Sequence, residues 1–220
     1  MNSCKAAYSQ LAQIYYNGYG TSVNYPEALY WGVKAIAEND TTAAYTLGRY
    51  YYEGKACEKD YAKALSYYKM GAEANRGDCY YGCYLCYTFG PKGICDQKLA
   101  FGSLVKAVNQ LEKEYTDNRH ISSNLPFASY NLGVAYDNGY GTAKNYAKAM
   151  NFYMKAANFP VDASSANETK TCVAMAQCAV AQMYHTGHGT TRSEAKAKQW
   201  MRKAAANGDA DAIEALKNWK

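Results

Sequence analysis

The sequence predicts an all-α fold, a solenoid of about five helix-turn-helix units in series. The first observation behind this is a Tyr-x-x-Gly pattern that ends at Gly18, Gly54, Gly139 and Gly187. The second is a lysine- and alanine-rich stretch of helical spacing after each of these turns, and the third is that no segment has the pattern of a strand. Repeats of roughly 20–50 residues typically present an extended surface to other proteins rather than a catalytic pocket.

The first helix of each unit carries a large apolar residue beside a small one, with a tyrosine four positions after the large residue. Apolar residues at i and i+4 share one face of a helix, and a small neighbour lets a second helix approach that face. The large residues are Leu11, Leu47, Leu132 and Val180, the small ones are Ala12, Gly48, Gly133 and Ala181, and the tyrosines are Tyr15, Tyr51, Tyr136 and Tyr184.

A second helix begins shortly after each of these turns. Pro26 suits such a start, because its missing N–H group costs little in the first turn of a helix. Alanines, lysines and bulky apolar residues then continue the pattern to endings such as Lys155-Ala156-Ala157. We expect these second helices to begin at Tyr25, Tyr61, Tyr146 and Glu194.

A degenerate unit fills the gap in the middle of the repeat. The segment 83–87 takes the place of its first helix, Gly90-Pro91-Lys92-Gly93 the turn, and 99–108 the second helix. One continuous domain over residues 1–220 is expected, with polar, turn-forming insertions at 109–126 and 159–174 and a C-terminal capping helix at 209–220. The units fall at about 6–40, 42–77, 78–108, 127–158 and 175–207.

The glycines of the turns are predicted to be structural. Glycine tolerates positive φ, which the chain needs where one helix stops and the next begins. We therefore expect alanine at Gly54 or Gly139 to lower stability without affecting a ligand. The predicted turn residues are Gly18, Gly20, Gly54, Gly139, Gly141 and Gly187.

The pattern Ala-x-x-x-Leu-Gly-x-x-Tyr-x-x-Gly-x-Gly, followed by a second helix that ends in Lys-Ala-Ala, spans Ala128 to Ala157. It resembles the Sel-1-like repeat, a relative of the tetratricopeptide repeat. The resemblance covers nearly the whole chain and implies a right-handed α/α superhelix. The degenerate unit departs from it by placing Cys83 and Tyr84 where leucine and glycine are usual.

Charge and composition narrow the classes of partner. The formal net charge is +5, and the lysines are scattered over the second helices. Nucleic-acid binders concentrate positive charge along one stripe, so no nucleic-acid partner is expected. No apolar run is long enough to cross a bilayer, so no membrane insertion is expected. We expect a monomer without a cofactor, cytoplasmic if the chain is complete and periplasmic or secreted if a signal peptide was removed.

Eight cysteines leave their chemical state open. Cys79, Cys83 and Cys86 fall on one helical face, where free cysteine packs as a small hydrophobe. With Cys95 they could instead supply four thiolates to zinc, but the paired Cys-x-x-Cys spacing of zinc sites is missing, and no metal site is assigned. Some secreted proteins of the resembled family bridge the two helices of each unit by a disulfide, and the second helices here contain no cysteine. The eight are Cys4, Cys57, Cys79, Cys83, Cys86, Cys95, Cys172 and Cys178.

Two further motifs could carry chemistry. His185-x-x-His188 could hold a metal, but with no carboxylate or cysteine column nearby we interpret these histidines as exposed turn residues. A Ser-x-x-Lys motif, as in penicillin-recognising enzymes, occurs at Ser66, Ser103 and Ser193. Three copies reflect lysine-rich helices, and the accompanying Ser-Asp-Asn and Lys-Thr-Gly elements are absent. No catalytic residue is assigned.

A partner-binding face is predicted by analogy. In tetratricopeptide-like solenoids the first helix of each unit lines the concave face, and counting from the Leu-Gly pair gives the inward positions. Tyrosine and arginine are common among them, and these residue types are enriched in binding hot spots. The predicted partner-binding residues are Tyr16, Tyr45, Arg49, Tyr52, Tyr81, Tyr130, Asp137 and His185.

The resemblance implies a non-catalytic scaffold or adaptor that binds a protein or peptide partner on its concave surface. One alternative is an immunity or inhibitor protein that caps a toxin, since bacterial members of the family occur in such roles. Another is a cell-wall or β-lactam-related hydrolase, since some cysteine-rich members have been described as penicillin-binding. A metal-stabilised binder is the third.

Overall fold

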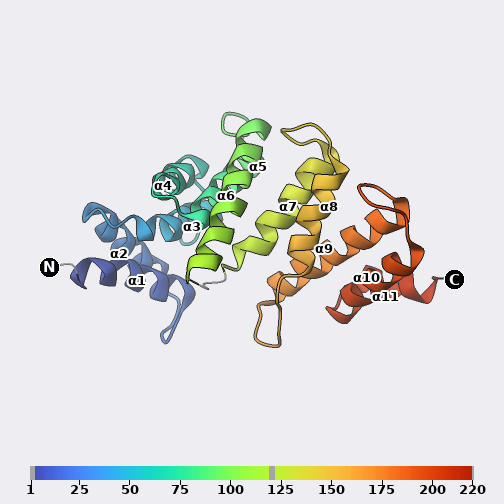
Figure 1. Ribbon diagram of the computed structural model, residues 1–220. Coiled ribbons are helices and arrows are strands. Elements are labelled where there is room, and N and C mark those ends of the chain that lie inside the picture. Colours follow the sequence, from blue (N-terminus) through green and yellow to red (C-terminus); the bar gives the residue numbers. More distant parts are fainter. Residues whose placement is uncertain (1–2, 119–121, 220) are drawn as a thin grey trace. The chain divides into compact units, whose positions relative to one another are not determined.

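The computed structural model describes residues 3–118 and 122–219. All regular secondary structure in these ranges is helical, as predicted (Figure 1). A short 3-10 helix, η1 (Thr41–Ala43), precedes α3. None of the described helices is long and apolar enough to cross a membrane. The α-helices are α1 (Ser3–Asn17), α2 (Tyr25–Ala37), α3 (Ala44–Glu53), α4 (Tyr61–Glu73), α5 (Gly77–Phe89), α6 (Gln97–Asn118), α7 (Asn124–Asn138), α8 (Tyr146–Ala157), α9 (Asn167–Thr186), α10 (Glu194–Ala206) and α11 (Ala210–Lys217).

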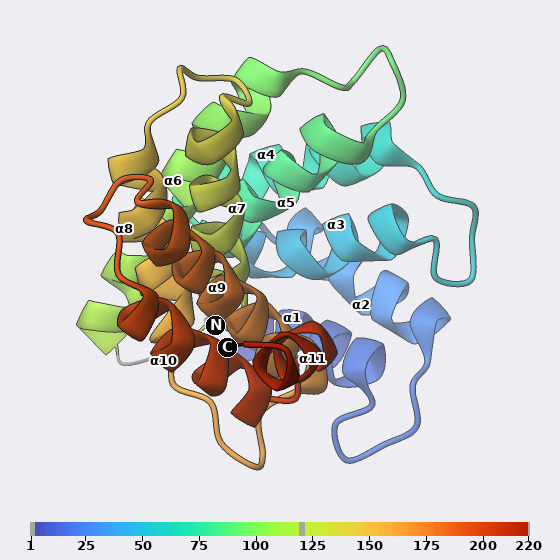
Figure 2. The same cartoon turned by 90° about the vertical axis from the view of Figure 1, so that its right-hand side faces the viewer.

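The helices belong to two compact units that divide within α6, after Glu114. Unit 1 contains α1 to α5 and most of α6, and unit 2 contains α7 to α11. Within each unit, helices that follow one another in the chain pack together (Figures 1 and 2). In unit 1, α1 packs on α2, α3 on α4 and α4 on α5; in unit 2, α7 packs on α8, α8 on α9, α9 on α10 and α10 on α11.

The small residues of the first helices make room for rings from the second helices. Tyr68 of α4 is 1% exposed because its ring fits between two glycines, Gly48 of α3 and Gly82 of α5. A Cβ atom at either glycine would lie 2.4 Å from a Tyr68 ring carbon. In unit 2, a Cβ at Gly133 of α7 would lie 2.6 Å from the ring of Tyr153 on α8. The alternation of small and large residues in the sequence therefore reflects close contact between helices.

The second helices begin with a repeated hydrogen-bond arrangement that uses the tyrosine of the first helix. The Asp60 amide donates to the Tyr51 carbonyl at 3.0 Å, and the Asp60 carboxylate accepts from the Lys63 amide at 2.9 Å. Such side-chain caps satisfy amides that have no partner within the helix. The other pairs of cap residue and tyrosine are Asn24 with Tyr15, Asn145 with Tyr136 and Ser193 with Tyr184.

The degenerate unit keeps this arrangement in spite of its unusual sequence. The Asp96 amide donates to the Tyr87 carbonyl at 2.9 Å, and the Asp96 carboxylate accepts from the amides of Lys98 and Leu99. Its turn differs from the others, since Gly90 has a φ of −70°. The cap is thus preserved where the left-handed glycine is not.

The predicted turn glycines all have positive φ. At Gly54, φ is 68° and an added Cβ would lie 2.9 Å from Lys59 Cγ; at Gly139, φ is 79° and the corresponding distance to Lys144 Cγ is 3.1 Å. Backbone amides of both glycines donate to carbonyls in the preceding helix, which ends the helix in the left-handed manner. The same sign of φ is found at Gly18, Gly20, Gly141 and Gly187.

The first expected insertion is largely helical. Helix α6 continues past residue 108 to its end at Asn118. Leu111 is 1% exposed and packs against Gly77 of α5. The contact is so close that a Cβ at Gly77 would lie 2.6 Å from Leu111 Cγ. The Gly77 amide donates to Glu114 Oε1 at 2.9 Å. Contacts between the extended part of α6 and the start of α5 therefore account for the longer helix.

The second expected insertion also contributes to a helix. Helix α9 begins at Asn167, and its first turns bury Thr169, Cys172 and Val173. The polar run before it forms a turn in which Asp162 accepts hydrogen bonds from Ser164 and Ser165. Only the first part of the expected insertion is therefore a loop.

Candidate partner-binding surface

One face of unit 2 carries three adjoining hollows along α9. Their volumes are about 440, 420 and 330 Å³, in order from the start of α9 to its end. Tyr130 and Met175 line both the first and the second, and Gln182, Met201 and Ala215 line both the second and the third. We call the three hollows together the α9 groove. Helices α7, α9, α10 and α11 all contribute to it.

The α9 groove has apolar side chains that a partner could cover. Met175 is 43% exposed although it lies in the middle of the groove. Tyr130 is half-buried, and its ring centroid lies 5.6 Å from that of Tyr153, which holds it in place. Methionine is flexible and polarizable and adapts to apolar partners, while tyrosine combines a large ring with a polar hydroxyl.

The charges in the α9 groove are acidic. Four carboxylate residues line it, and its lining residues include neither lysine nor arginine, although the chain carries a net charge of +5. Asp209 also caps α11, since its Oδ1 accepts from the Ala212 amide at 2.8 Å, and Asp211 is exposed. The four are Glu168, Asp209, Asp211 and Glu194.

His185 lies at the end of the groove beside Trp219. Its Nδ1 is 3.0 Å from Glu194 Oε2, and its ring is 6.3 Å from the Trp219 ring in an edge-on arrangement. Hydrogen bonds from Arg192, and then from His185, lower the pKa of the Glu194 carboxyl. This end of the groove is therefore polar, and contacts among His185, Glu194, Arg192 and Trp219 hold its side chains in place.

Two of the three residues predicted to bind a partner in unit 2 line the α9 groove. They are Tyr130 and His185. The third, Asp137, makes an internal contact, because its Oδ2 accepts a hydrogen bond from the Tyr153 hydroxyl at 3.3 Å. Burial, followed by the Asp137 charge, raises the pKa of Tyr153. Whether any of the three touches a partner stays a prediction.

In unit 1 the structure brings Tyr16, Tyr45 and Arg49 together. The Arg49 guanidinium lies 4.6 Å from the centroid of the Tyr16 ring and 5.9 Å from that of Tyr45. Its Nε is also paired with Glu53 Oε1 at 3.0 Å. Tyr16 is only 4% exposed, so the surface that this cluster offers to a partner comes mainly from the half-buried Tyr45 and Arg49.

The two remaining residues predicted in unit 1 pack on other tyrosines. The half-buried Tyr52 lies edge-on to Tyr61 at 5.5 Å between centroids, and burial raises the pKa of Tyr52 to about 12. Tyr81 is 8% exposed and stacks on Tyr84 at 5.5 Å. Tyr81 therefore has less surface for a partner than Tyr52, because most of its ring is used within the unit.

The cysteines with described side chains are free thiols. Cys79, Cys83 and Cys86 are buried along α5, and burial raises the pKa of each to about 12. Cys95 is exposed and lies in the turn before α6. No three His, Cys, Asp or Glu side chains gather as a metal site would require, within the part of the chain that the structure describes. Cys4 lies outside the residues whose side chains are described.

The histidines of the last repeat have separate partners. His185 is held by Glu194, whereas the His188 ring stacks on Tyr146 at 4.4 Å between centroids. The expectation that no carboxylate lies near the pair is wrong for His185. Glu194, the first residue of α10, comes back to this histidine because the intervening turn reverses the chain.

The three Ser-x-x-Lys motifs have different surroundings. Ser66 donates to the Lys63 carbonyl at 2.7 Å, and the Ser193 hydroxyl accepts from the Lys196 amide as a helix cap. Ser103 and Lys106 instead line a pocket of unit 1. Two of the three motifs are thus accounted for by helix geometry.

Several residues of the α9 groove were not predicted. Met175 and Cys178 stand six and three positions before Ala181, as Phe127 and Tyr130 stand before Gly133. Both lie within the expected unit 175–207, so the same count reaches them, although neither was predicted. Asp209, Asp211 and Trp219 belong to the segment after the last repeat, for which the rule has no positions.

Comparison with protein-family models matches the Sel1 repeat at residues 5–40, 41–75, 126–158 and 174–209. These segments contain nearly all of α1 to α4, α7, α8 and α10 and the part of α9 from residue 174 on, and they leave out α5 and α6. No curated protein matches the chain.

Solved structures with the same fold come from bacteria. A Sel1 repeat protein from Oxalobacter formigenes has a TM-score of 0.71 and 23% identity over 96% of this chain and 74% of its own. A protective antigen of uropathogenic Escherichia coli, c5321, which has an SLR fold, has a TM-score of 0.62 and 22% identity over 96% of this chain. The match covers 48% of the Escherichia coli chain, so this chain spans about half its length.

Proposed function

Because this chain belongs to the Sel1 repeat family, whose members commonly serve as protein-interaction scaffolds, we propose that it binds another protein through the α9 groove. The occupant is a segment of the partner that carries apolar side chains together with lysine or arginine. The repeat fold is typically a non-catalytic scaffold, and the proposal is accordingly binding without chemistry.

The observation that carries the proposal is the combination of apolar and acidic residues in one elongated hollow. Met175 and Tyr130 offer apolar contact, and covering them removes their surface from water. Glu168, Asp209 and Asp211 surround this contact with negative charge, which favours a basic partner and disfavours an acidic one. Apolar anchors inside a polar rim are the usual anatomy of a protein interface.

A separate contact with a protein partner is proposed at unit 1. Tyr45, Arg49 and Tyr52 lie on α3 and keep part of their surface exposed. The Arg49 side chain is already fixed by Glu53 and Tyr16, so little side-chain entropy would be lost when a partner covers it. Alanine at Tyr45 is expected to weaken partner binding by about 2 kcal/mol if the ring is an anchor.

The test begins with a random peptide library selected on the full chain. Selected peptides are expected to combine apolar residues with lysine or arginine. Met175→Lys should then weaken peptide binding by at least about tenfold. The substitution removes apolar surface from the groove and introduces a positive charge that repels the basic residue of the peptide. Isothermal titration calorimetry measures the dissociation constants.

Ile213→Lys is the matched control. Ile213 is 41% exposed, close to the 43% of Met175, and it lies on α11 without lining any of the three hollows. Its replacement should leave peptide binding unchanged. Equal weakening by both variants, or selected peptides without basic residues, would contradict the proposed groove.

A further inference from the structure

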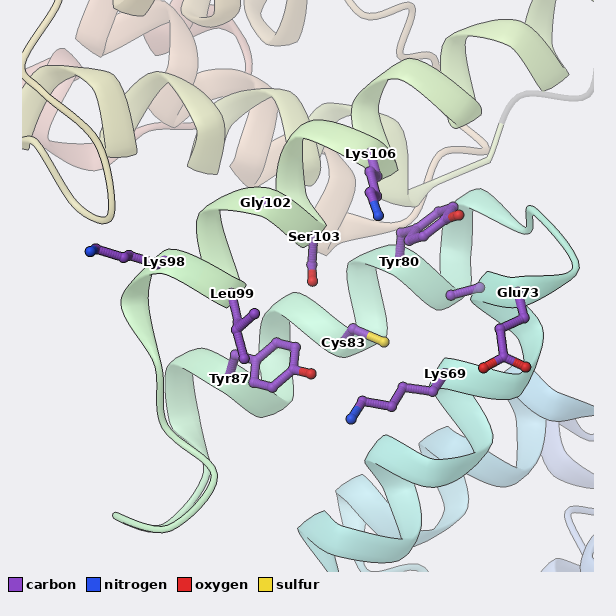
Figure 3. A pocket seen from close by; sticks show the side chains of 11 residues that line it. Lys69, Glu73, Tyr80, Cys83, Tyr87, Lys98, Leu99, Gly102, Ser103 and Lys106 are labelled. Atoms are coloured by element: carbon purple, nitrogen blue, oxygen red, sulfur yellow. The ribbon is translucent and has the colours of Figure 1, made fainter.

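A pocket in unit 1 is lined mainly by residues outside the repeats that the family model matches. It is formed by α4, α5 and α6 and has a volume of about 320 Å³ (Figure 3). Helices α5 and α6 belong to the segment between the matched repeats at 41–75 and 126–158. The pocket is therefore a feature of this chain rather than a product of the repeat pattern.

The pocket contains more positive than negative charge. Lys69, Lys98 and Lys106 line it together with a single carboxylate residue, Glu73. None of the three lysines forms an ion pair within residues 7–116 and 122–219, and Figure 3 shows Lys69 and Lys106 on different helices, on opposite sides of Cys83. Two ammonium groups from α4 and α6 thus line the same pocket.

Cys83 lies between the two lysines. Its thiol is on α5, with Lys69 on one side and Lys106 on the other. Burial raises the pKa of Cys83 to about 12, and the positive charges of Lys69 and Lys106 both act in the opposite direction. An anion bound near Cys83 would therefore be attracted by both lysines.

The other lining groups complete a binding site for an organic anion. The Ser103 hydroxyl points into the pocket beside Cys83 in Figure 3 and can donate a hydrogen bond. The rings of Tyr80 and Tyr87 flank the lysines: Lys106 Nζ is 5.7 Å from the Tyr80 centroid and Lys69 Nζ is 6.0 Å from that of Tyr87. Rings can stack on an aromatic ligand while the ammonium groups bind its charge.

We propose that this pocket binds a small aromatic molecule with one anionic group, a carboxylate or a phosphate. Lys69 and Lys106 attract the anion, Ser103 donates to it, and the half-buried ring of Tyr80 packs on the aromatic part. The volume lies at the lower end of the range of about 300–1,000 Å³ for small-molecule sites. This site is independent of the α9 groove, because all its residues belong to unit 1.

The proposal is tested by titrating the full chain with phenyl phosphate or with phenylacetate. The amide chemical shifts of the protein report binding. Saturable shifts are expected in α4, α5 and α6 for one or both anions. The neutral benzyl alcohol and inorganic phosphate should each bind at least about tenfold more weakly, because each lacks one of the two kinds of contact. The stronger of the two anions identifies the anionic group.

Substitutions assign the contacts. Lys69→Gln and Lys106→Gln should each weaken binding of the better anion by about tenfold, since each removes one of the positive charges that attract the anion. Lys113→Gln is the matched control, because Lys113 is an exposed lysine on α6 that does not line the pocket. Far-UV circular dichroism confirms that each variant keeps its helices.

Three results would overturn the proposal. One is the absence of saturable shifts with both anions at millimolar concentration. Another is benzyl alcohol binding as tightly as the anions, which would mean that the lysines play no part. The last is a loss of binding in Lys113→Gln that equals the loss in Lys106→Gln, which would indicate attraction by the general charge of the chain.

Discussion

Single glycines decide how closely the helices of unit 1 approach one another. Tyr68 is buried because neither Gly48 nor Gly82 has a side chain to displace its ring. The sequence showed a small residue in each first helix, and the structure shows which ring needs the space. Glycine is therefore required for different physical reasons in the two places: for close packing in the helices and for positive φ in the turns.

Gly48→Ala should lower the free energy of unfolding by about 1–3 kcal/mol, because the added Cβ would force the Tyr68 ring out of its position. Urea unfolding followed by far-UV circular dichroism measures the change. Gly102→Ala is the control: nothing lies within 4 Å of its added Cβ, and alanine should stabilise the exposed helix by about 0.5–1 kcal/mol. A Gly48→Ala variant as stable as the parent would contradict the packing described for Tyr68.

Thiol reactivity should follow the burial of each cysteine. Cys57 and Cys95 are exposed and should be labelled first by iodoacetamide at neutral pH. Cys79, Cys83, Cys86 and Cys172 are buried, with pKa values raised to about 12, so almost no thiolate is present to react. Peptide mass spectrometry gives the order of labelling. Labelling of Cys83 as fast as Cys95 would contradict the burial of α5.

The same burial makes stability depend on alkaline pH. The ordinary thiol pKa is 9.0, and that of Cys83 in the folded chain is about 12. Between these values the folded state binds more protons than the unfolded state, so this contribution to stability is complete below pH 9 and is lost as pH rises toward 12. Urea unfolding under reducing conditions should show lower stability at pH 10 than at pH 8. The decline should be shallower for Cys83→Ala. An equal decline in both proteins would contradict a contribution of the Cys83 thiol to the loss of stability at alkaline pH.

In each helix pair, the cap residue and the tyrosine carbonyl hold the turn together. Asp60 with Tyr51 and Asp96 with Tyr87 form the same hydrogen bonds, although only the first pair belongs to a repeat that the family model matches. The degenerate unit therefore retains the start of its second helix while its first helix has exchanged leucine and glycine for Cys83 and Tyr84.

Asp60→Ala and Asp96→Ala should each lower the free energy of unfolding by about 1 kcal/mol, because each removes a side-chain cap from the start of a helix. Glu58→Ala, at a neighbouring exposed position, should change it by less than about 0.5 kcal/mol. Chemical denaturation of the three variants provides the comparison. An Asp96→Ala variant as stable as Glu58→Ala would mean that the degenerate unit does not rely on this cap.

Helix pairs could be predicted from the sequence, whereas some helix ends could not. The spacing of Leu47, Gly48 and Tyr51 defines a helical face by itself, because these residues are local neighbours. The extension of α6 depends on Leu111 meeting Gly77, and that contact joins residues far apart in the chain. Polar runs near 109–126 and 159–174 therefore suggested insertions where tertiary contacts produce longer helices.

The two units present surfaces of opposite charge. The pocket of α4, α5 and α6 has three lysines, and the α9 groove has four carboxylate residues and neither lysine nor arginine in its lining. The net charge of +5 describes neither surface. Ligands of opposite charge are accordingly proposed for the two sites.

The partner-binding face was only partly predictable. Counting from the Leu-Gly pair reached Tyr130 and His185, because they lie on the first helices of their repeats. Counting could not reveal that Tyr81 is buried or that the Asp137 carboxylate accepts a hydrogen bond from Tyr153, since both depend on contacts with other helices. Asp209 and Asp211 were missed because they follow the last repeat.

A charge exchange between the α9 groove and a selected peptide tests whether a partner binds in this groove. Asp211→Lys should weaken peptide binding by about tenfold or more. Replacing the basic residue of the peptide by glutamate should restore binding to this variant and weaken binding to the parent protein. Glu214→Lys, an exposed carboxylate on α11 that does not line the groove, should leave both peptides unaffected. Calorimetry that shows equal losses in the two variants, or no restoration by the glutamate peptide, would contradict binding in the α9 groove.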